Sequence, residues 1–592
     1  MPVHETPPAL AHRIGRALGA LWHDLRYVLG FALPIKLEIR FYQYIRGERF
    51  SIADLWARSV RRFPGKAALV FHGRTWTFAE LDELVRRAAA ALEQDGLAPG
   101  AHAAIFGENT PAFWWHAIAV IQMGCVPVIL RPSLGEAELL EYLAGYDRLP
   151  LLLHSDALAA PPSSVCPRFE RISCYADDGA DLAAVAPTEE RALAARRRGV
   201  SLFSEAFHIG TSNTTGVSKA CIEHQGNALG FIRAHQYMKG LTSSDRVYTT
   251  ATVSHGEGFA VGGLVPWAVG ASVYLDDAFR PDHFFDECRR NDVTVVNYVG
   301  VTPRRLLSTP PSPADRSHRV RVANGHEMLG GWTEFQERFG IRRVVEYFAA
   351  TEGTYFFRND RLPGAVGFVG PLGQAIYPFA ILRLDDDNEL VLEGGRPVRC
   401  ERGEVGELFG AIVPSDPLSL STYADARLNA GSKVRSLIRE GDLWHRSGDL
   451  IRHDPSGYVY FAGKRSSSFR VRGVYVNPQV VEDKVAHAAF QGALPARDCL
   501  AFFVRRVSSG ERVVALRLAL SGFFEPAAIF EVLEAVLDPV EAPEFVVLDN
   551  APIAYTDTLR RRRLAPIVDE HDLRVGDVRV LERAARVCAG VQ

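Results

Sequence analysis

From Phe50 onward, short apolar runs alternate with longer segments of helical periodicity, and this alternation limits the fold more than any other feature. Residues 67–71 and 126–130 have the composition of buried strands, whereas residues 78–94 and 111–123 have the spacing of helices. Strands that alternate with helices form a parallel sheet with helices on both faces. The chain is therefore predicted to be an α/β protein.

The pattern divides the chain into three parts. Residues 1–49 form an N-terminal amphipathic helical segment. Residues 50–464 contain the alternating region and, towards their end, a β-rich subdomain. Residues 465–592 have a separate, small α+β character. Since 592 residues are too many for a single core, more than one domain is expected.

The N-terminal segment carries apolar residues at helical spacing, and Pro34 is expected to end or kink that helix. These residues are Leu18, Leu21, Trp22, Leu25, Val28 and Phe31. Two alternatives remain open: the helix packs on the main body, or it lies in a membrane interface with Arg16 and Arg26 near the headgroups. In either case we expect it to affect location or solubility and not chemistry.

Composition excludes several classes of protein. The net charge of −3 and a pI of about 6.7 provide no field that would attract nucleic acid. The 8 cysteines are scattered without a C-x-x-C pair, which argues against a zinc site or a disulfide framework and fits a reducing cytoplasm. No apolar run reaches the ~18 residues of a membrane-spanning helix. A cytoplasmic protein, in possible peripheral contact with a membrane, is expected.

The stretch from Thr211 to Lys219 is the strongest local sign of chemistry. It contains Thr211, Ser212, Asn213, Thr214, Thr215, Gly216, Val217, Ser218 and Lys219. Hydroxyls and backbone N–H groups on such a turn can surround phosphate oxygens, and lysine adds a positive charge. The order of residues is not that of the Walker loop. The alternative for this stretch alone is a polar surface loop.

Further motifs follow this loop in a fixed order. They are Phe348–Glu352, Ser447-Gly448-Asp449, Gly463-Lys464 with Arg472-Gly473, and Thr556–Arg560. Together with the loop, this set resembles the adenylate-forming superfamily of acyl-CoA synthetases, luciferase and peptide-synthetase adenylation domains. It is most similar to the branch of fatty-acid transport proteins and very-long-chain acyl-CoA synthetases. The resemblance covers roughly residues 50–565 and implies a large multi-sheet domain followed by a small mobile domain.

The resemblance implies a reaction in two halves. A carboxylate attacks the α-phosphate of Mg-ATP, which gives an acyl-adenylate and pyrophosphate. The small domain then rotates about its hinge, and a thiol, usually that of CoA, takes the acyl group. The expected cofactors are ATP and Mg²⁺, with CoA uncertain. The expected partners are a small-molecule acid and CoA or another small acceptor.

The resemblance also assigns roles to residues of this chain. The loop residues Thr211, Ser212, Thr214, Thr215 and Lys219, with Asn213 and Gly216 in the same turn, would hold the phosphates. Of the remaining residues, Thr351 would contact the α-phosphate, Glu352 would bind Mg²⁺, and Phe348 would lie on the adenine face. Asp449 would accept the ribose hydroxyls, Lys464 would lie near the ribose and hinge, and Asn324 would belong to the adenine-contacting loop. A carboxylate suits both Mg²⁺ and a pair of hydroxyls.

The chain departs from the family pattern at several positions. Asn213 stands where the family has glycine, and asparagine tolerates positive φ better than most residues. Ser466 and Ser467 stand where the hinge carries an aspartate. Arg560 occupies the position of the lysine that bridges the α-phosphate and the carboxylate, and its guanidinium is wider, with donors in a fixed fork. Arg560 is predicted to be catalytic with altered geometry.

Four residues are predicted to line the substrate pocket. His255 follows the strand that leads into the acyl pocket in the family, and Glu257 lies two residues further on. Tyr298 and Gly300 belong to a motif shared with the fatty-acid transport branch. For Glu257 two interpretations remain open: a loop carboxylate that faces water, or a partner for a polar substrate that carries an amine.

Three functions are compatible with these motifs. The first is an acyl-CoA synthetase, an AMP-forming ligase acting on a fatty-acid-like or other carboxylic acid. The second keeps the adenylation half and changes the partner, for example a diazotase that activates nitrite for an aromatic amine without CoA. The third is an inactive binding or scaffold protein, against which the retained Lys219, Glu352 and Asp449 argue. The altered loop and hinge and Arg560 keep the second open.

Overall fold

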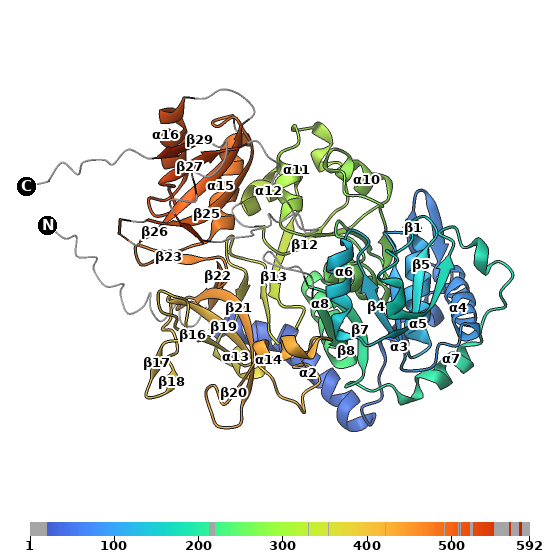
Figure 1. Cartoon of the computed structure of the whole chain (residues 1–592). Coiled ribbons are helices and arrows are strands. Elements are labelled where there is room, and N and C mark those ends of the chain that lie inside the picture. Colours follow the sequence, from blue (N-terminus) through green and yellow to red (C-terminus); the bar gives the residue numbers. More distant parts are fainter. Residues whose placement is uncertain are drawn as a thin grey trace, which may run out of the picture.

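The structure is a computed structural model, and it describes most of the chain. The described residues are 21–211, 219–328, 331–352, 354–420, 422–490, 492–506, 508–509, 511–520, 525–549, 567–569, 573 and 579–582. Two large sheets form the main body, and a third sheet near the C-terminal end of the chain forms a separate lobe (Figure 1). The predicted α/β class, with a large domain and a small one, is confirmed.

A 6-stranded sheet forms one side of the main body. Its strands are, in spatial order, β6 (Phe169–Tyr175), β5 (Leu149–Ser155), β3 (His102–Phe106), β4 (Val126–Leu130), β7 (Glu205–Gly210) and β8 (Ala220–His224). All neighbouring pairs are parallel except β7 and β8, which run antiparallel. The predicted phosphate loop connects these two strands. Thr211 and Lys219 therefore lie at its base, where the Thr211 N–H bonds to the Lys219 carbonyl at 3.0 Å.

A 14-stranded sheet carries the rest of the main body. Its central strands are parallel and comprise β1 (Ala67–Phe71), β10 (Ser272–Tyr274), β9 (Arg246–Thr249), β11 (Val295–Tyr298), β12 (Val322–Gly325) and β13 (Arg343–Ala349), with β2 (Arg74–Thr77) antiparallel at the edge. Its antiparallel part comprises β14 (Phe356–Asn359), β15 (Gly367–Phe368), β22 (Tyr458–Lys464), β21 (Leu443–His453), β19 (Val405–Ala411), β16 (Phe379–Leu382) and β20 (Lys433–Arg435). This part is the predicted β-rich subdomain, and it continues the parallel sheet.

Some helices of the main body start at residues whose side chains cap free N–H groups. Ser51 with Asp54, and Thr77 with Glu80, form capping boxes at the first two. The helices are α3 (Ile52–Arg62), α4 (Phe78–Gln94), α5 (Pro111–Gln122), α6 (Glu136–Tyr142), α7 (Glu190–Arg196), α8 (Gln225–Lys239), α9 (Val265–Trp267), α10 (Phe284–Arg290), α11 (Val301–Leu307), α12 (Trp332–Phe339), α13 (Pro371–Ile376) and α14 (Ala426–Ser432). All residues of α5 are buried, as expected for a helix in the centre of a large domain.

The N-terminal segment is helical from residue 21 to residue 45. It consists of residues 21–27, η1 (Val28–Ala32), α2 (Leu33–Arg40) and η2 (Phe41–Ile45). The helix continues through Pro34, so of the two predicted effects, ending or kinking the helix, the first is wrong. The turn before it is wound as a π-helix, with the Leu33 N–H bonded to the Val28 carbonyl, and Pro34 occupies the first turn of α2, where its missing N–H does no harm.

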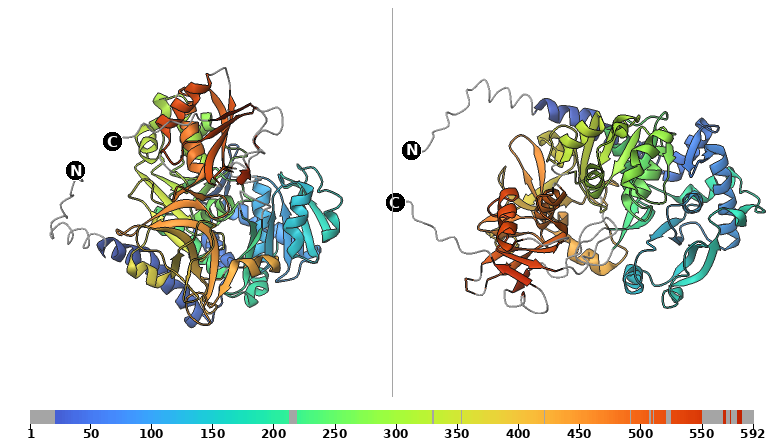
Figure 2. Two further views of the ribbon diagram at one scale, coloured as in Figure 1. Left: turned by 60° about the vertical axis from the view of Figure 1, so that its left-hand side comes forward. Right: turned by 90° about the horizontal axis from the view of Figure 1, so that it is seen from above.

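One face of this N-terminal helix packs on the main body. Tyr27, Phe31 and Ile39 are buried. The Asp24 carboxylate accepts backbone N–H groups from Leu372 and Gly373, at 2.7 and 3.0 Å, at the start of α13. The first of the two alternatives for this segment is thus the arrangement found, and Figure 2 shows the helix along the edge of the main body. Among the described helices, we find none with the length and hydropathy needed to cross a bilayer.

The C-terminal lobe has its own core. Its 5-stranded sheet comprises β28 (Ile567–Asp569), β25 (Ala496–Arg505), β26 (Arg512–Leu520), β27 (Phe545–Leu548) and β29 (Arg579–Glu582). The helices α15 (Pro478–Phe490) and α16 (Pro526–Val536) pack on it, and the hairpin of β23 (Phe469–Val471) and β24 (Val474–Val476) precedes it. A further short hairpin, β17 (Leu392–Glu393) with β18 (Arg396–Pro397), belongs to the main body. The main body ends with β22 at Lys464.

Candidate active site

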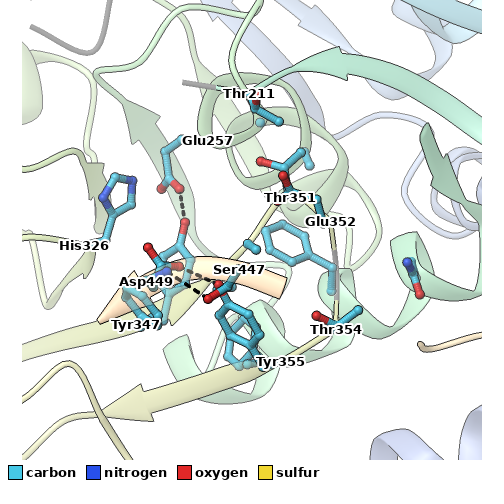
Figure 3. Close-up of a pocket in the computed structure, with 18 of the residues that line it drawn as sticks. Thr211, Glu257, His326, Tyr347, Thr351, Glu352, Thr354, Tyr355, Ser447 and Asp449 are labelled. Atoms are coloured by element: carbon cyan, nitrogen blue, oxygen red, sulfur yellow. Dashed lines mark hydrogen bonds between the residues drawn. The ribbon is translucent and has the colours of Figure 1, made fainter. Parts of the chain in front are cut away.

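A cavity of about 510 Å³ lies beside α8, at the ends of β7 and β13, along β8 and beside the middle of β21. Residues from motifs that are far apart in the sequence meet on its walls. Those predicted to bind the nucleotide or the metal are Thr211, Lys219, Phe348, Thr351, Glu352, Asp449 and Lys464. In Figure 3, Thr351 and Glu352 lie near Thr211, and Ser447 and Asp449 lie on β21. Parallel strands place ligand-binding residues at their carboxyl ends in this way.

The carboxylate of Glu352 is held by a tyrosine. The Tyr423 hydroxyl donates a hydrogen bond to Glu352 Oε1. The Lys219 ammonium lies over the ring of the same tyrosine, 5.7 Å from its centre. Tyr423 thus connects the base of the phosphate loop to the acidic residue. Its role was not predicted, because its sequence neighbourhood carries no signal.

The Asp449 carboxylate is held between a lysine and a second tyrosine. Antiparallel pairing of β21 and β22 places Asp449 opposite Lys464, and the two side chains form an ion pair. The Tyr355 hydroxyl donates to Asp449 Oδ2 at 2.7 Å. Burial lowers the pKa of Lys464, but Asp449 more than compensates, so the pKa is raised and the lysine stays charged. Tyr355 is a further residue that sequence reasoning missed.

Phe348 belongs to an aromatic wall of the cavity. Its ring is stacked with that of Tyr355 at 5.8 Å between centres, and the ring of Phe461 lies 5.6 Å away. Phe348 and Phe461 both line the cavity. A flat apolar wall beside a carboxylate that can accept two hydroxyls suits a nucleoside.

Not every predicted residue lies in this cavity. Ser212–Ser218 and Arg560 fall outside the described residues. Tyr298 does not line the described cavity, because its hydroxyl is buried and donates to Glu346 Oε1 at 2.6 Å. Gly300 instead precedes α11, and Asn324 is buried on β12, where its amide bonds to the Val345 carbonyl at 3.0 Å.

His255 and Glu257 do line the cavity. Glu257 begins the π-helix η7 (Glu257–Leu264), and only 2% of its surface is exposed. The Tyr347 hydroxyl donates to Glu257 Oε2. The interpretation of Glu257 as a loop carboxylate facing water is therefore wrong: it is buried because η7 packs beside β9 and α8.

The far wall of the cavity is apolar and includes the N-terminal helix. Phe31 and Ile35 line it, and both are about as buried as core residues, at 1% and 2% exposed. Phe231 on α8 and Phe356 on β14 complete this wall, with the rings of Phe31 and Phe356 5.7 Å apart. The N-terminal segment therefore contributes two side chains to the wall of the cavity.

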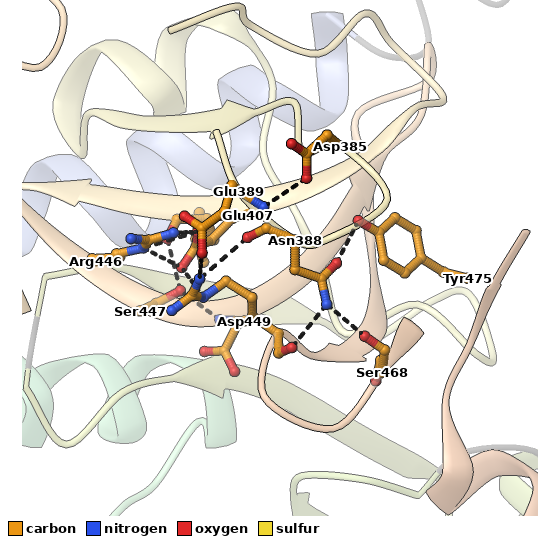
Figure 4. A network of polar contacts seen from close by, with 11 residues as sticks. Asp385, Asn388, Glu389, Glu407, Arg446, Ser447, Asp449, Ser468 and Tyr475 are labelled. Carbon is orange, nitrogen blue, oxygen red and sulfur yellow. Dashed lines mark hydrogen bonds and ion pairs between the residues drawn. The ribbon is translucent and has the colours of Figure 1, made fainter. Parts of the chain in front are cut away.

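The connection between the two domains is held by Asn388. Its side-chain amide donates to the carbonyls of Arg465 and Ser468, both at 3.0 Å, and its Oδ1 accepts from the Tyr475 hydroxyl at 3.1 Å (Figure 4). Asn388 adopts a φ of 62°, which asparagine tolerates in a turn. The four residues 465–468 between the last strand of the main body and β23 are therefore fastened to the main body.

A fold of two large sheets with a small C-terminal lobe, and a cavity that combines a carboxylate, a lysine and an aromatic wall, defines an adenylate-forming enzyme. A profile of the AMP-binding enzyme family matches residues 56–410, which is more than half of the chain. The chain belongs to this family.

Similar proteins agree with this assignment. Long-chain fatty acid transport protein 1 of Bos taurus is 29% identical over 595 residues, covering 94% of this chain and 89% of that protein. A medium/long-chain fatty-acid–CoA ligase of Mycobacterium tuberculosis is 27% identical, covering 87% of this chain and 85% of that protein. The solved structure of a benzoate CoA ligase from Burkholderia xenovorans superposes with a TM-score of 0.69 at 20% identity, covering 87% and 99% of the two chains. The chain is an AMP-forming ligase of the acyl-CoA synthetase type, a class that uses ATP with Mg²⁺ and transfers the acyl group to CoA.

Proposed function

We propose that this ligase activates a carboxylic acid with an extended apolar part and joins it to CoA. The observation that supports this is the single cavity that joins the nucleotide residues to an apolar wall. The carboxylate of the acid would lie near Thr351, and its chain would run between Phe231 and Phe356 towards Phe31 on the N-terminal helix. An apolar wall of this kind stabilises an alkyl or aryl chain by about 25 cal/mol for each Å² removed from water.

The residues at the nucleotide end divide the binding of ATP among them. Asp449, kept in place by Lys464 and Tyr355, would accept the ribose hydroxyls, and Phe348 would cover the adenine. Lys219 would contact the phosphates. Glu352 fits Mg²⁺ because it offers carboxylate oxygens at the edge of the phosphate loop, and the bound cation would offset phosphate charge. Arg560 is proposed to contact the reacting carboxylate.

The test is release of pyrophosphate by the purified full chain with a series of fatty and aromatic acids. We expect turnover with at least one apolar acid, and thioester formation when CoA is added. Nitrite with an aromatic amine should give no more pyrophosphate than a blank. Turnover with nitrite and the amine that does not require CoA would instead establish the diazotase. No pyrophosphate with any substrate would favour a binding protein.

We also propose that the outer face of the N-terminal helix contacts a membrane surface. The exposed apolar side chains on it are Leu21, Trp22, Leu25, Leu29, Leu37, Phe41, Tyr44 and Ile45. Arg26 and Arg46 are exposed on the same segment and suit anionic headgroups. Sedimentation with vesicles that contain phosphatidylserine should retain the protein, and Trp22→Glu with Leu29→Glu should release it. Equal recovery of both proteins in the supernatant would contradict this proposal.

A further inference from the structure

The acid-binding part of the cavity contains a carboxyl group that no plain fatty acid requires. Glu257 lines the cavity at the start of η7 and is 2% exposed. In Figure 3 its carboxylate faces the Tyr347 hydroxyl. Glu257 lies on η7 and the proposed ribose-binding Asp449 lies on β21, so the two carboxylates come from different walls of the cavity, and we assign the wall of Glu257 to the acid.

Only one of the two oxygens of this carboxyl group accepts a hydrogen bond from a described residue. Oε2 accepts from the Tyr347 hydroxyl, whereas Oε1 is buried and accepts no hydrogen bond from any described residue. The charge of Lys239 acts on Glu257, but the Lys239 ammonium donates its hydrogen bond to Asn297 Oδ1 at 3.1 Å. Burial raises the pKa of Glu257 to about 7, so a substantial share of the group is ionised near neutral pH.

A second acceptor in the same cavity is in a comparable state. Asn227 lies in the first turn of α8, is 6% exposed and lines the cavity. Its amide N–H donates to the Leu420 carbonyl at 2.6 Å, while its Oδ1 accepts no hydrogen bond within the described part of the chain. Burying an acceptor without a donor is unfavourable, so two such acceptors in one cavity call for donors on the ligand.

We propose that the acid taken by this enzyme carries a hydroxyl or amino group that donates to Oε1 of Glu257. This inference depends on the proposed function and narrows the acid to a substituted one. The Tyr347 hydroxyl fixes the carboxyl group so that Oε1 remains available. Hydroxyl and amine share the chemistry that Glu257 recognises, and a substrate without either leaves a buried oxygen unsatisfied. Sites built around a hydrogen bond reject analogues that lack the matching group.

The experiment compares matched pairs of acids of equal length. One member of each pair is unsubstituted, and the other carries a hydroxyl or an amino group at a defined distance from the carboxylate. The ratio of kcat/KM within each pair is measured by pyrophosphate release for the full chain. We expect a preference of about 10-fold or more for the substituted acid at one position, and the hydroxyl and amino series show which donor is used.

Two variants make the result specific. Glu257→Leu should abolish the preference within the pair, and Glu257→Gln, which keeps an acceptor oxygen, should retain part of it. The matched control is Glu346→Gln, because Glu346 is also buried and bonded to a tyrosine hydroxyl but does not line the described cavity. This control should keep the full ratio. Thermal unfolding of each variant identifies any that fail to fold.

The outcomes separate this inference from the proposed function. Strong turnover of plain acids without any preference, or an equal change of both pair members in Glu257→Leu, would overturn the inference and leave the ligase intact. Should Glu257→Leu not fold, Tyr347→Phe provides the same test, because freeing the carboxyl group must alter the ratio. If no acid is turned over by the wild-type chain, the proposed function and this inference fail together.

Discussion

The two ends of the cavity are built in different ways. The nucleotide end uses short motifs in which neighbouring residues act together, such as Thr351 with Glu352 on the turn after β13. The acid end uses single side chains from segments far apart in the sequence, such as Phe31, Phe231 and Phe356. The nucleotide is the same for every member of the class, so its contacts form recognisable motifs. The acid differs between members, and its contacts form none.

The first prediction concerns the nucleotide end and has the largest expected effect. Asp449→Ala and Glu352→Gln should each lower pyrophosphate release about 100-fold or more, because each removes a positioned charge from the reacting centre. Steady-state kinetics with any accepted acid provides the measurement. Glu401→Gln, an exposed carboxylate outside the cavity, is the control. Turnover near that of the wild type in both variants would refute the assignment of the nucleotide end.

The second prediction concerns the acid end. Phe31→Ala should deepen the cavity and raise the preference for a longer acid over a shorter one by about 10-fold, since each accommodated methylene contributes about 1–3 kcal/mol. The KM for ATP should stay within a factor of two or so. Leu37→Ala, on the exposed side of the same helix, is the control. An unchanged length preference would show that the substrate does not reach the N-terminal helix.

The third prediction concerns the residues that connect the two domains. Asn388→Ala removes two hydrogen bonds to the carbonyls of residues 465 and 468. Each such bond contributes about 0.5–1.5 kcal/mol, so the small domain should be freer to rotate. Single-turnover transfer from a preformed acyl-adenylate to CoA should become about 3- to 10-fold faster, and adenylation should change less. Equal slowing of both steps would show that Asn388 only supports the fold.

The fourth prediction uses pH and has the smallest effect. Burial raises the pKa of Glu257 to about 7 in the native state, whereas in the unfolded chain the group has its ordinary pKa. Between these two values the native state keeps a proton that the unfolded state has lost, so the free energy of unfolding falls as pH rises towards 7. Glu257→Gln does not titrate. Its free energy of unfolding, relative to the wild type, should grow by about 1 kcal/mol or more between about pH 5 and pH 7. Urea unfolding at several pH values provides the measurement, and a difference independent of pH would contradict it.

Much of the fold was predictable from local patterns. The helix over Phe78–Gln94 has the predicted bounds, because Thr77 and Glu80 cap it and its apolar spacing is regular. Pro34 was predicted to end or kink the helix, but the helix does not end there. A π-helical turn accommodates the missing N–H, and packing on the main body stabilises the helix. Local sequence does not report such long-range packing.

The candidate site was predictable only where residues act as motifs. Glu352 and Asp449 were found, whereas their partners Tyr423 and Tyr355 were missed, since a tyrosine that orients a carboxylate has no fixed spacing from it. Asn388 was missed for the same reason. Tyr298 was assigned to the pocket by similarity, but its hydroxyl faces Glu346 inside the sheet.

The N-terminal helix has one consequence for regulation. Its inner side chains form part of the cavity wall that we propose for the acid, and its outer side chains are exposed, so both surfaces belong to one helical segment. Any ligand that binds the outer surface and shifts the helix must change the affinity for the acid. Thermodynamic linkage then requires that the acid change the affinity for that ligand by the same factor. Binding of the acid would therefore change the affinity of the outer surface for its ligand, although the acid does not contact that surface.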